Sequence, residues 1–419
     1  MAEKDILALL REELVPAMGC TEPIAVAYAA AVARELLGNL PDLITVRCSG
    51  NIIKNVKGVI VPGTGDLKGV DTSAILGCIS GNAGKKLEVL SNISQADVEY
   101  AKELIASKMC KVELIENEEN LYIDVLMTLG DNSSEVVLAG THTNIIKTVR
   151  NGQIVFESEW KKNKMNSENK YSLKDLYDYS NHINISEIQD VLDQQIKDNL
   201  LISEEGIKNT YGANIGKTLI QFSNDSIETI ARAYAAAGSD ARMGGCELPV
   251  VINSGSGNQG ITVSVPVIKY AEYLNVSKEK LYKALVFSNL VSIYIKTGIG
   301  KLSAYCGVVS ASCGAVAGVC YLFDDSMEII SKTVTNTLGN ISGIICDGAK
   351  SSCAAKIATS LEAAFLGRKL ALNGNVFREG EGLTGKCIDK TIENIWDLGK
   401  IGMKQTDIEI LKLMISEGD

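Results

Sequence analysis

The chain is poor in several residue types that common functional sites require. Its two histidines, His142 and His182, lie far apart in the sequence, which excludes a histidine-rich zinc site of the metalloprotease kind. Aromatic residues make up only 5% of the chain, and there are six prolines. Positive charge is also scarce, because 41 Lys and Arg face 51 Asp and Glu and no local basic patch stands out. This balance argues against nucleic acid or an anionic membrane surface as a partner.

What remains is the composition of an ordinary globular protein. The 419 residues are 46% hydrophobic and 22% charged, which leaves room for a large core and for more than one domain. The sequence opens without the basic and then apolar pattern of a secretory signal, so we expect a cytoplasmic protein with reduced thiols. The longest uncharged run, 302–323, is filled with small residues and is better explained as a buried segment than as a membrane span.

Local patterns predict a fold of class α+β. Helices are expected over 3–14 and 24–37, near 71–86, 95–108, 172–181 and 185–201, and throughout most of the chain from 205 onward. Partial alternation of β-branched residues predicts strands at 43–48, 52–61, 111–115, 121–129 and 135–138. Asn151-Gly152 between two apolar runs predicts a β-hairpin, and the polar stretch 157–171 predicts a linker.

These elements suggest a mostly helical catalytic domain built from both chain ends, with an inserted α/β subdomain. The expected units are residues 1–40, helices that pack on the catalytic domain; 41–204, the α/β insertion with its linker helices; and 205–419, the helical catalytic domain. The density of Gly, Ala, Ser and Cys in the last unit predicts helices that pack at close range.

Cysteine spacing carries the first functional signal. No two of the eleven cysteines are three positions apart, which excludes Cys-x-x-Cys zinc ribbons, thioredoxin-like sites and bacterial ferredoxins. Five of them fall close together at seven-residue steps: Cys306, Cys313, Cys320, Cys346 and Cys353. Such steps can form a packing stripe on a helix, or they can deliver thiolates to an iron–sulfur cluster from glycine-containing loops.

A second notable cysteine is Cys20, which directly precedes a helix that has Pro23 in its first turn. The positive end of a helix dipole lowers the pKa of a thiol, so Cys20 is a candidate base, nucleophile or metal ligand. A structural cysteine before a capped helix is the alternative.

The segment 253–260 contains the pattern GxGxxG, but the β-branched residues at 261–266, ended by Pro266, do not predict the helix that a dinucleotide site needs. A polar loop that binds a small carboxylate is the preferred interpretation, and a turn with only internal bonds is the alternative. The candidate substrate-binding residues in this loop are Asn253, Ser254, Ser256, Asn258 and Gln259. His142, which can titrate near neutral pH, and Lys54 are further candidates.

Taken together, these segments resemble the L-cysteine desulfidase family and, more distantly, the α chain of iron–sulfur L-serine dehydratases. The resemblance runs over nearly the whole chain, including 49–55 and 62–65, and its most specific mark is the MGCTEP segment at 18–23. It implies that Cys306, Cys346 and Cys353 hold a 4Fe-4S cluster with one open iron, and that Cys20 is the catalytic base. Cys313 is the alternative first ligand, because a second cysteine follows the ligand in the dehydratase pattern.

The activity implied is a β-elimination of L-cysteine to sulfide, ammonia and pyruvate without pyridoxal phosphate. Rival hypotheses are the same chemistry on L-serine, a non-catalytic iron–sulfur sensor, and a cluster-free protein with a redox thiol at Cys20. The expected partner is a small amino-acid substrate, with no nucleic acid and no membrane, and a homo-oligomer is compatible with the sequence.

Overall fold

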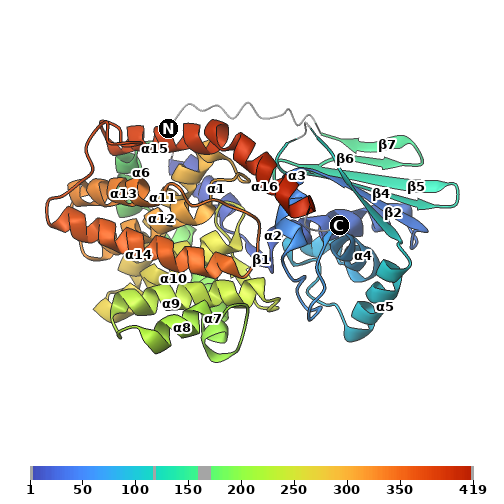
Figure 1. Ribbon diagram of the computed structural model, residues 1–419, viewed down its shortest axis with the longest axis horizontal. Helices are drawn as coiled ribbons and strands as arrows, with labels where there is room; N and C mark the ends of the chain where they lie inside the picture. Colours follow the sequence, from blue (N-terminus) through green and yellow to red (C-terminus); the bar gives the residue numbers. More distant parts are fainter. Residues whose placement is uncertain (1–2, 117–118, 159–170, 417–419) are drawn as a thin grey trace.

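The computed structural model describes residues 3–116, 119–158 and 171–416. They form a large helical body and a smaller unit around a six-stranded sheet (Figure 1). The helices of the body are α1 (Glu3–Glu13), α6 (Leu173–His182), α7 (Gln189–Lys208), α8 (Ile215–Phe222), α9 (Ile227–Met243), α10 (Gly257–Leu274), α11 (Lys278–Ile299), α12 (Gly307–Leu322), α13 (Met327–Ile341), α14 (Ser352–Leu372) and α15 (Ile388–Asp397).

The smaller unit has the strand order β3-β2-β4-β5-β6-β7, in which only β2 and β3 run parallel. Helices α2 and α4 pack beside the sheet, and α5 packs on α4. The elements of this unit are α2 (Thr21–Leu37), β2 (Leu43–Cys48), α3 (Gly50–Lys57), α4 (Val70–Ser80), α5 (Gln95–Ala106), β3 (Cys110–Leu114), β4 (Tyr122–Leu129), β5 (Asn132–Ala139), β6 (Ile145–Arg150) and β7 (Gln153–Glu157). The predicted α+β class with a mostly helical body is therefore confirmed.

Contacts between the two units include a pair of short strands and the last helix. The short strands β1 (Pro16–Met18) and β8 (Pro249–Val251) pair antiparallel, which brings the start of α2 beside the loop that follows β8. The last helix, α16 (Lys404–Ser416), runs from the helical body toward the sheet unit and contacts α3 (Figure 1).

Small residues allow the close helix packing that the composition predicts. At the crossing of α2 and α4, a Cβ added to Gly77 would lie 2.1 Å from the carbonyl oxygen of Ala27, so only glycine fits there. Helix α12, which covers most of the uncharged run 302–323, is buried along almost its whole length. Within the three described ranges, no helix is long and apolar enough to cross a membrane.

Two local predictions are wrong. Residues 52–61, predicted as a strand, lie largely in α3, where Ile52 and Val56 are four positions apart and both are buried. Residues 261–266 are part of α10, which starts at the N-cap Ser256 and contains Pro266. Burial of the β-branched side chains outweighs their weak helix propensity. A dinucleotide fold still does not result, because β8 belongs to a two-stranded antiparallel sheet rather than to a βαβ unit.

The contacts of α2 and α7 differ from the expected grouping of the chain. Helix α2 packs mainly on α4 and the sheet, whereas α7 packs on α9 and α10 in the helical body. The other strand and helix predictions agree with the structure to within a few residues, apart from the linker 157–171, which lies mostly outside the described residues.

Candidate active site

The loops that carry Cys306 and Cys346 are hydrogen-bonded side by side. The Cys306 N–H donates to the carbonyl of Ile344 (3.1 Å), and the Cys346 N–H donates to the carbonyl of Ala304 (2.6 Å). Cys306 is also the N-cap of α12, so its position is fixed by a helix start as well as by the neighbouring loop. This reciprocal pairing brings together two cysteines that are far apart in the sequence.

Cys353 completes a group of three cysteines. It lies in the first turn of α14, where its Sγ donates to the carbonyl of Gly348 (3.7 Å). Cys306, Cys346 and Cys353 line one cavity. Cys313, in contrast, is fully buried inside α12 and is not part of the cavity wall. The geometry therefore places Cys306, rather than Cys313, beside the other two thiols.

The three thiols differ in their electrostatics. A hydrogen bond from Cys306 lowers the pKa of Cys346 well below its ordinary value; burial opposes this, while the ammonium groups of Lys54 and Lys296 reinforce it. The same contact, together with burial, raises the pKa of Cys306 well above its ordinary value. Burial also raises the pKa of Cys353. Cys346 is thus the thiol that the surroundings favour as a thiolate, the form that binds iron.

The cysteine group suits a cluster better than a single ion. Among the described residues, no three Cys, His, Asp or Glu side chains converge closely enough to hold one metal ion. In a four-iron cluster each thiolate binds a different iron, so the ligands stand around the cube rather than around one point. Three cysteines that line one cavity from two neighbouring loops and the start of α14, beside buried cationic groups, fit that requirement.

Cys20 lies at the N-cap of α2 in the same cavity. Its Sγ donates to Oε2 of Glu22 (3.0 Å), which also accepts from the hydroxyl of Thr21 (3.1 Å). The other carboxylate oxygen of Glu22 is 3.6 Å from Nε2 of His142. Cys20, Glu22 and His142 therefore form a buried chain of proton-carrying groups, with only the cysteine end and Glu22 at the cavity wall.

The environment of Cys20 changes its acidity in the direction opposite to the sequence-based expectation. Burial raises the pKa of Cys20 well above its ordinary value, the Glu22 carboxylate adds to this, and Arg242 opposes it. Desolvation and a negative neighbour thus outweigh the dipole of α2. For Glu22, burial by itself would raise the pKa, but the nearby imidazole of His142 and the hydrogen bond from Cys20 outweigh it and lower the pKa to about 2.

The loop after β8 contributes three of its five predicted residues to the cavity wall: Ser256, Asn258 and Gln259. Ser256 caps α10 by accepting a hydrogen bond from the Gln259 N–H (3.5 Å). The side-chain oxygen Oε1 of Gln259 is buried and has no hydrogen-bond partner among the described residues. A buried acceptor without a donor at a cavity indicates a place for a ligand N–H group.

The other predicted substrate-binding residues lie outside the cavity wall. Asn253 donates to Asn289 (3.0 Å) and accepts from Ser254 (3.0 Å) within the core. His142 contacts Glu22, as described above. Lys54 points to α16 rather than into the cavity.

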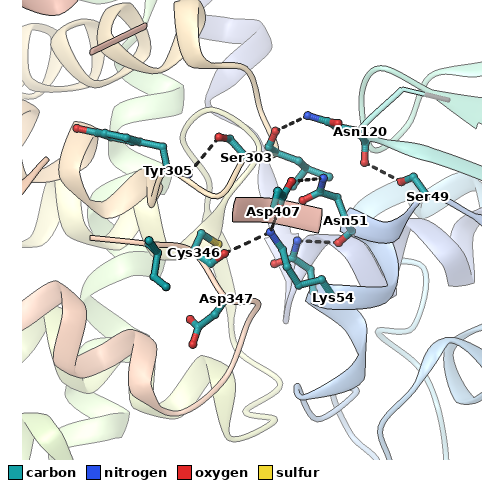
Figure 2. A network of polar contacts seen from close by, with 12 residues as sticks. Ser49, Asn51, Lys54, Asn120, Ser303, Tyr305, Cys346, Asp347 and Asp407 are labelled. Carbon is teal, nitrogen blue, oxygen red and sulfur yellow. Dashed lines mark hydrogen bonds and ion pairs between the residues drawn. The ribbon is translucent and has the colours of Figure 1, made fainter. Parts of the chain in front are cut away.

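Figure 2 shows where Lys54 is directed. Its ammonium donates to the Asp407 carboxylate of α16 and to the carbonyl of Cys346 (3.3 Å), and Asp407 also accepts from Asn51 (2.7 Å). Asn120 of the sheet unit donates to the carbonyl of Leu302 (2.9 Å), in the loop that leads to Cys306. The sheet unit and the last helix therefore hold both cysteine-bearing loops.

Two buried cations face the cavity. Arg242, at the end of α9, is 2% exposed and donates to Oδ1 of Asn258 (3.1 Å), while its Nε has no partner among the described residues. Lys296 of α11 is 3% exposed, and burial lowers its pKa to about 8 in spite of the nearby Cys346 and Cys306. Neither forms an ion pair with a carboxylate in the described ranges, although Asp407 acts on Lys296 electrostatically, so the cavity favours anionic occupants.

Comparison with known proteins places this site in a family. Residues 84–412 match the family described as serine dehydratase alpha chain. The chain belongs to this family. It is 49% identical over 415 residues to a UPF0597 protein of Lachnoclostridium phytofermentans, covering 99% of this chain and 100% of that one. A UPF0597 protein of Finegoldia magna is 46% identical over 417 residues (99% and 100% covered), and one of Fusobacterium nucleatum is 41% identical over 419 residues (98% of each).

Membership in the serine dehydratase alpha chain family confirms, at the level of the family, the resemblance seen in the sequence. The family is that of the iron–sulfur serine dehydratases, so membership indicates a lyase of the dehydratase type. The substrate and the roles of single residues stay predictions.

The sequence alone did not identify three charged residues of the cavity wall as candidate site residues. They are Glu22, Arg242 and Lys296. A signal existed for the two cations. Lys296 is the only charged residue between 284 and 299, and Arg242 ends the small-residue run that starts at 235 and contains a single acid, Asp240. A lone charge in an otherwise apolar or small-residue helix is rarely left without a function, because its burial is costly.

Proposed function

We propose that the protein is an L-cysteine desulfidase, which eliminates sulfide from its substrate without pyridoxal phosphate. The observation that supports this is the single cavity lined by the three clustered cysteines together with Cys20 and Arg242.

In this proposal Cys306, Cys346 and Cys353 hold a 4Fe-4S cluster, which supplies, when bound, a Lewis-acidic iron for the leaving sulfur. The remaining steps are carried out by side chains of the protein itself. Arg242 and Lys296 give the cavity wall the positive charge that binds an amino-acid carboxylate.

Arg242 and the start of α10 orient the substrate. The guanidinium has an unpaired Nε and is held by Asn258, so it is placed to bind the substrate carboxylate. The N-terminus of α10 adds backbone N–H groups and a favourable dipole. The unpaired Oε1 of Gln259 accepts a hydrogen bond from the substrate ammonium group.

Cys20 removes the α-proton of the substrate. Its own proton first passes through Glu22, to which the thiol already donates, to the imidazole of His142 beside the other carboxylate oxygen, which becomes the imidazolium. The Cα–H bond then breaks with transfer of the proton to the thiolate, the Cβ–S bond breaks, and sulfide leaves. The resulting aminoacrylate takes up one water and gives pyruvate and ammonia.

The decisive experiment combines analysis and turnover on protein purified without oxygen. We expect iron and acid-labile sulfide in the wild type, and sulfide and pyruvate from L-cysteine. Cys306→Ala, Cys346→Ala and Cys353→Ala should each lose iron, whereas Cys313→Ala, the matched control, should keep it. Cys20→Ala should keep iron and lose turnover. Iron-free wild-type protein that released sulfide at full rate would refute the proposal.

L-Serine is the second candidate substrate, because the family that matches is that of serine dehydratases. Pyruvate formation from L-serine that exceeds sulfide release from L-cysteine, at equal concentrations, would favour this activity. Iron-loaded protein that turned over neither amino acid would favour a sensor instead.

A further inference from the structure

Lys296 is a buried cation that the proposed elimination leaves without a role. It lies on α11 in a stretch that is buried from 284 to 296 almost without interruption, and its side chain is 3% exposed. Lys296 lines the same cavity as Cys306 and Cys346. Within the ranges that the structure describes, no carboxylate or carbonyl pairs with it. A buried ammonium without a counter-ion is strongly unfavourable, so an anion is expected to complete this position.

The other lysines near the cavity are already compensated. Lys301, also in the cavity wall, is 3.0 Å from the carboxylate of Glu13. Lys54 is paired with Asp407, whose second oxygen accepts from Asn51. Lys296 therefore differs from Lys301 and Lys54, because no carboxylate of the described residues forms an ion pair with it.

The thiols of Cys346 and Cys306 are the groups of the chain that complement Lys296 most strongly; Asp407 adds a smaller favourable effect, and Lys54 opposes it. Both thiols belong to the proposed ligand set. Three thiolates bring three negative charges into a buried cavity, where charge interactions are weakly screened. A fixed cation in the wall of the same cavity stabilises the more negative, reduced state of a cluster more than the oxidised state, and so raises the reduction potential.

We propose that Lys296 is the fixed counter-charge of the thiolate-bound cluster and sets its reduction potential. The inference rests on the proposed function, since it requires a cluster on the three cysteines. In this role Lys296 is a positioning residue, because its charge acts on the cysteine ligands of the cluster and not on the amino-acid substrate.

The test is an EPR-monitored redox titration of the anaerobically reconstituted holoprotein. In Lys296→Gln the midpoint potential should shift to a more negative value. Lys296→Arg, which keeps the charge, should stay near the wild type. Lys301→Gln is the matched control, because it removes one lysine charge from the same wall but one that Glu13 already compensates; its potential should change little. A Lys296→Gln potential equal to that of the wild type would overturn the inference.

A second variant separates this role from a packing role. Lys296→Met removes the same charge with an apolar side chain that suits a buried helix, and it should give the same negative shift as Lys296→Gln. In the iron-free form Lys296→Met should unfold at a temperature no lower than the wild type, because an uncompensated buried cation has been removed. A lower unfolding temperature of that form, with an unchanged potential in the holoprotein, would mark a structural lysine and overturn the inference. Wild-type protein without iron would instead refute the proposed function.

Discussion

Removal of the Asp407 carboxylate tests whether α16 is joined to the candidate site through a buried charge. Lys54 is 1% exposed and Asp407 is 14% exposed in their ion pair. Asp407→Ala leaves the Lys54 ammonium with the carbonyl of Cys346, 3.3 Å away, as its only partner among the described residues. Removing one member of a buried ion pair costs about 3–5 kcal/mol. Because Asp407 is partly exposed, we expect a loss of about 3 kcal/mol in the free energy of unfolding, near the lower end of that range.

The assay is urea unfolding of the iron-free protein followed by circular dichroism. Glu99→Ala is the control, because its carboxylate pairs with Lys102 at the surface (58% and 44% exposed) and exposed pairs contribute less than about 1 kcal/mol. The double variant Lys54→Met/Asp407→Leu should recover most of the loss, since an apolar pair can replace a buried ion pair at little cost. A loss for Asp407→Ala no larger than that for Glu99→Ala, or no recovery in the double variant, would refute the reasoning.

Three further predictions follow from single sites. The pKa of Glu22 is lowered from 4.5 to about 2, so its ionised form stabilises the folded protein fully above pH 4.5, and this stabilisation is lost as the pH falls toward 2. In Glu22→Gln the urea midpoint should therefore depend less on pH across this range. Arg242→Gln should raise the KM for L-cysteine at least about tenfold while the iron content stays constant, because a buried charged hydrogen bond to the carboxylate is lost. Gly77→Ala should lower stability by about 1–3 kcal/mol in urea unfolding, since its Cβ would overlap the backbone of Ala27, whereas Gly343→Ala, with open space around it, should change it little.

Much of the sheet unit could be predicted because its signals are local. The hairpin at Asn151-Gly152 forms as expected, with Arg150 paired to Gln153 and positive φ at both turn residues (49° and 76°), which Asn and Gly tolerate best. Strands β3, β4 and β5 follow from alternation and β-branched composition. In α3 and α10 β-branched residues are helical, because burial against neighbouring elements decides their conformation and a sequence pattern does not report that burial.

The candidate site could be predicted only in part. The cysteines and the loop after β8 were identified from spacing and composition, but their grouping depends on backbone hydrogen bonds between Cys306 and Ile344 and between Cys346 and Ala304. Such long-range pairs leave no periodic trace in a sequence. Arg242 was missed for the related reason that its neighbour Asn258 lies on another helix.

The charges around the cavity explain why these residues form one site. Glu22 contacts His142, and Lys301 pairs with Glu13, whereas neither Arg242 nor Lys296 forms an ion pair with a carboxylate among the described residues. Buried cations without an ion-pair partner are costly in a protein interior, so a neutral occupant would fit this cavity poorly. Under the proposed function, the carboxylate of an amino-acid substrate complements Arg242, and the thiolate ligands complement Lys296. The proposal thus accounts for both cations with one substrate and one set of ligands.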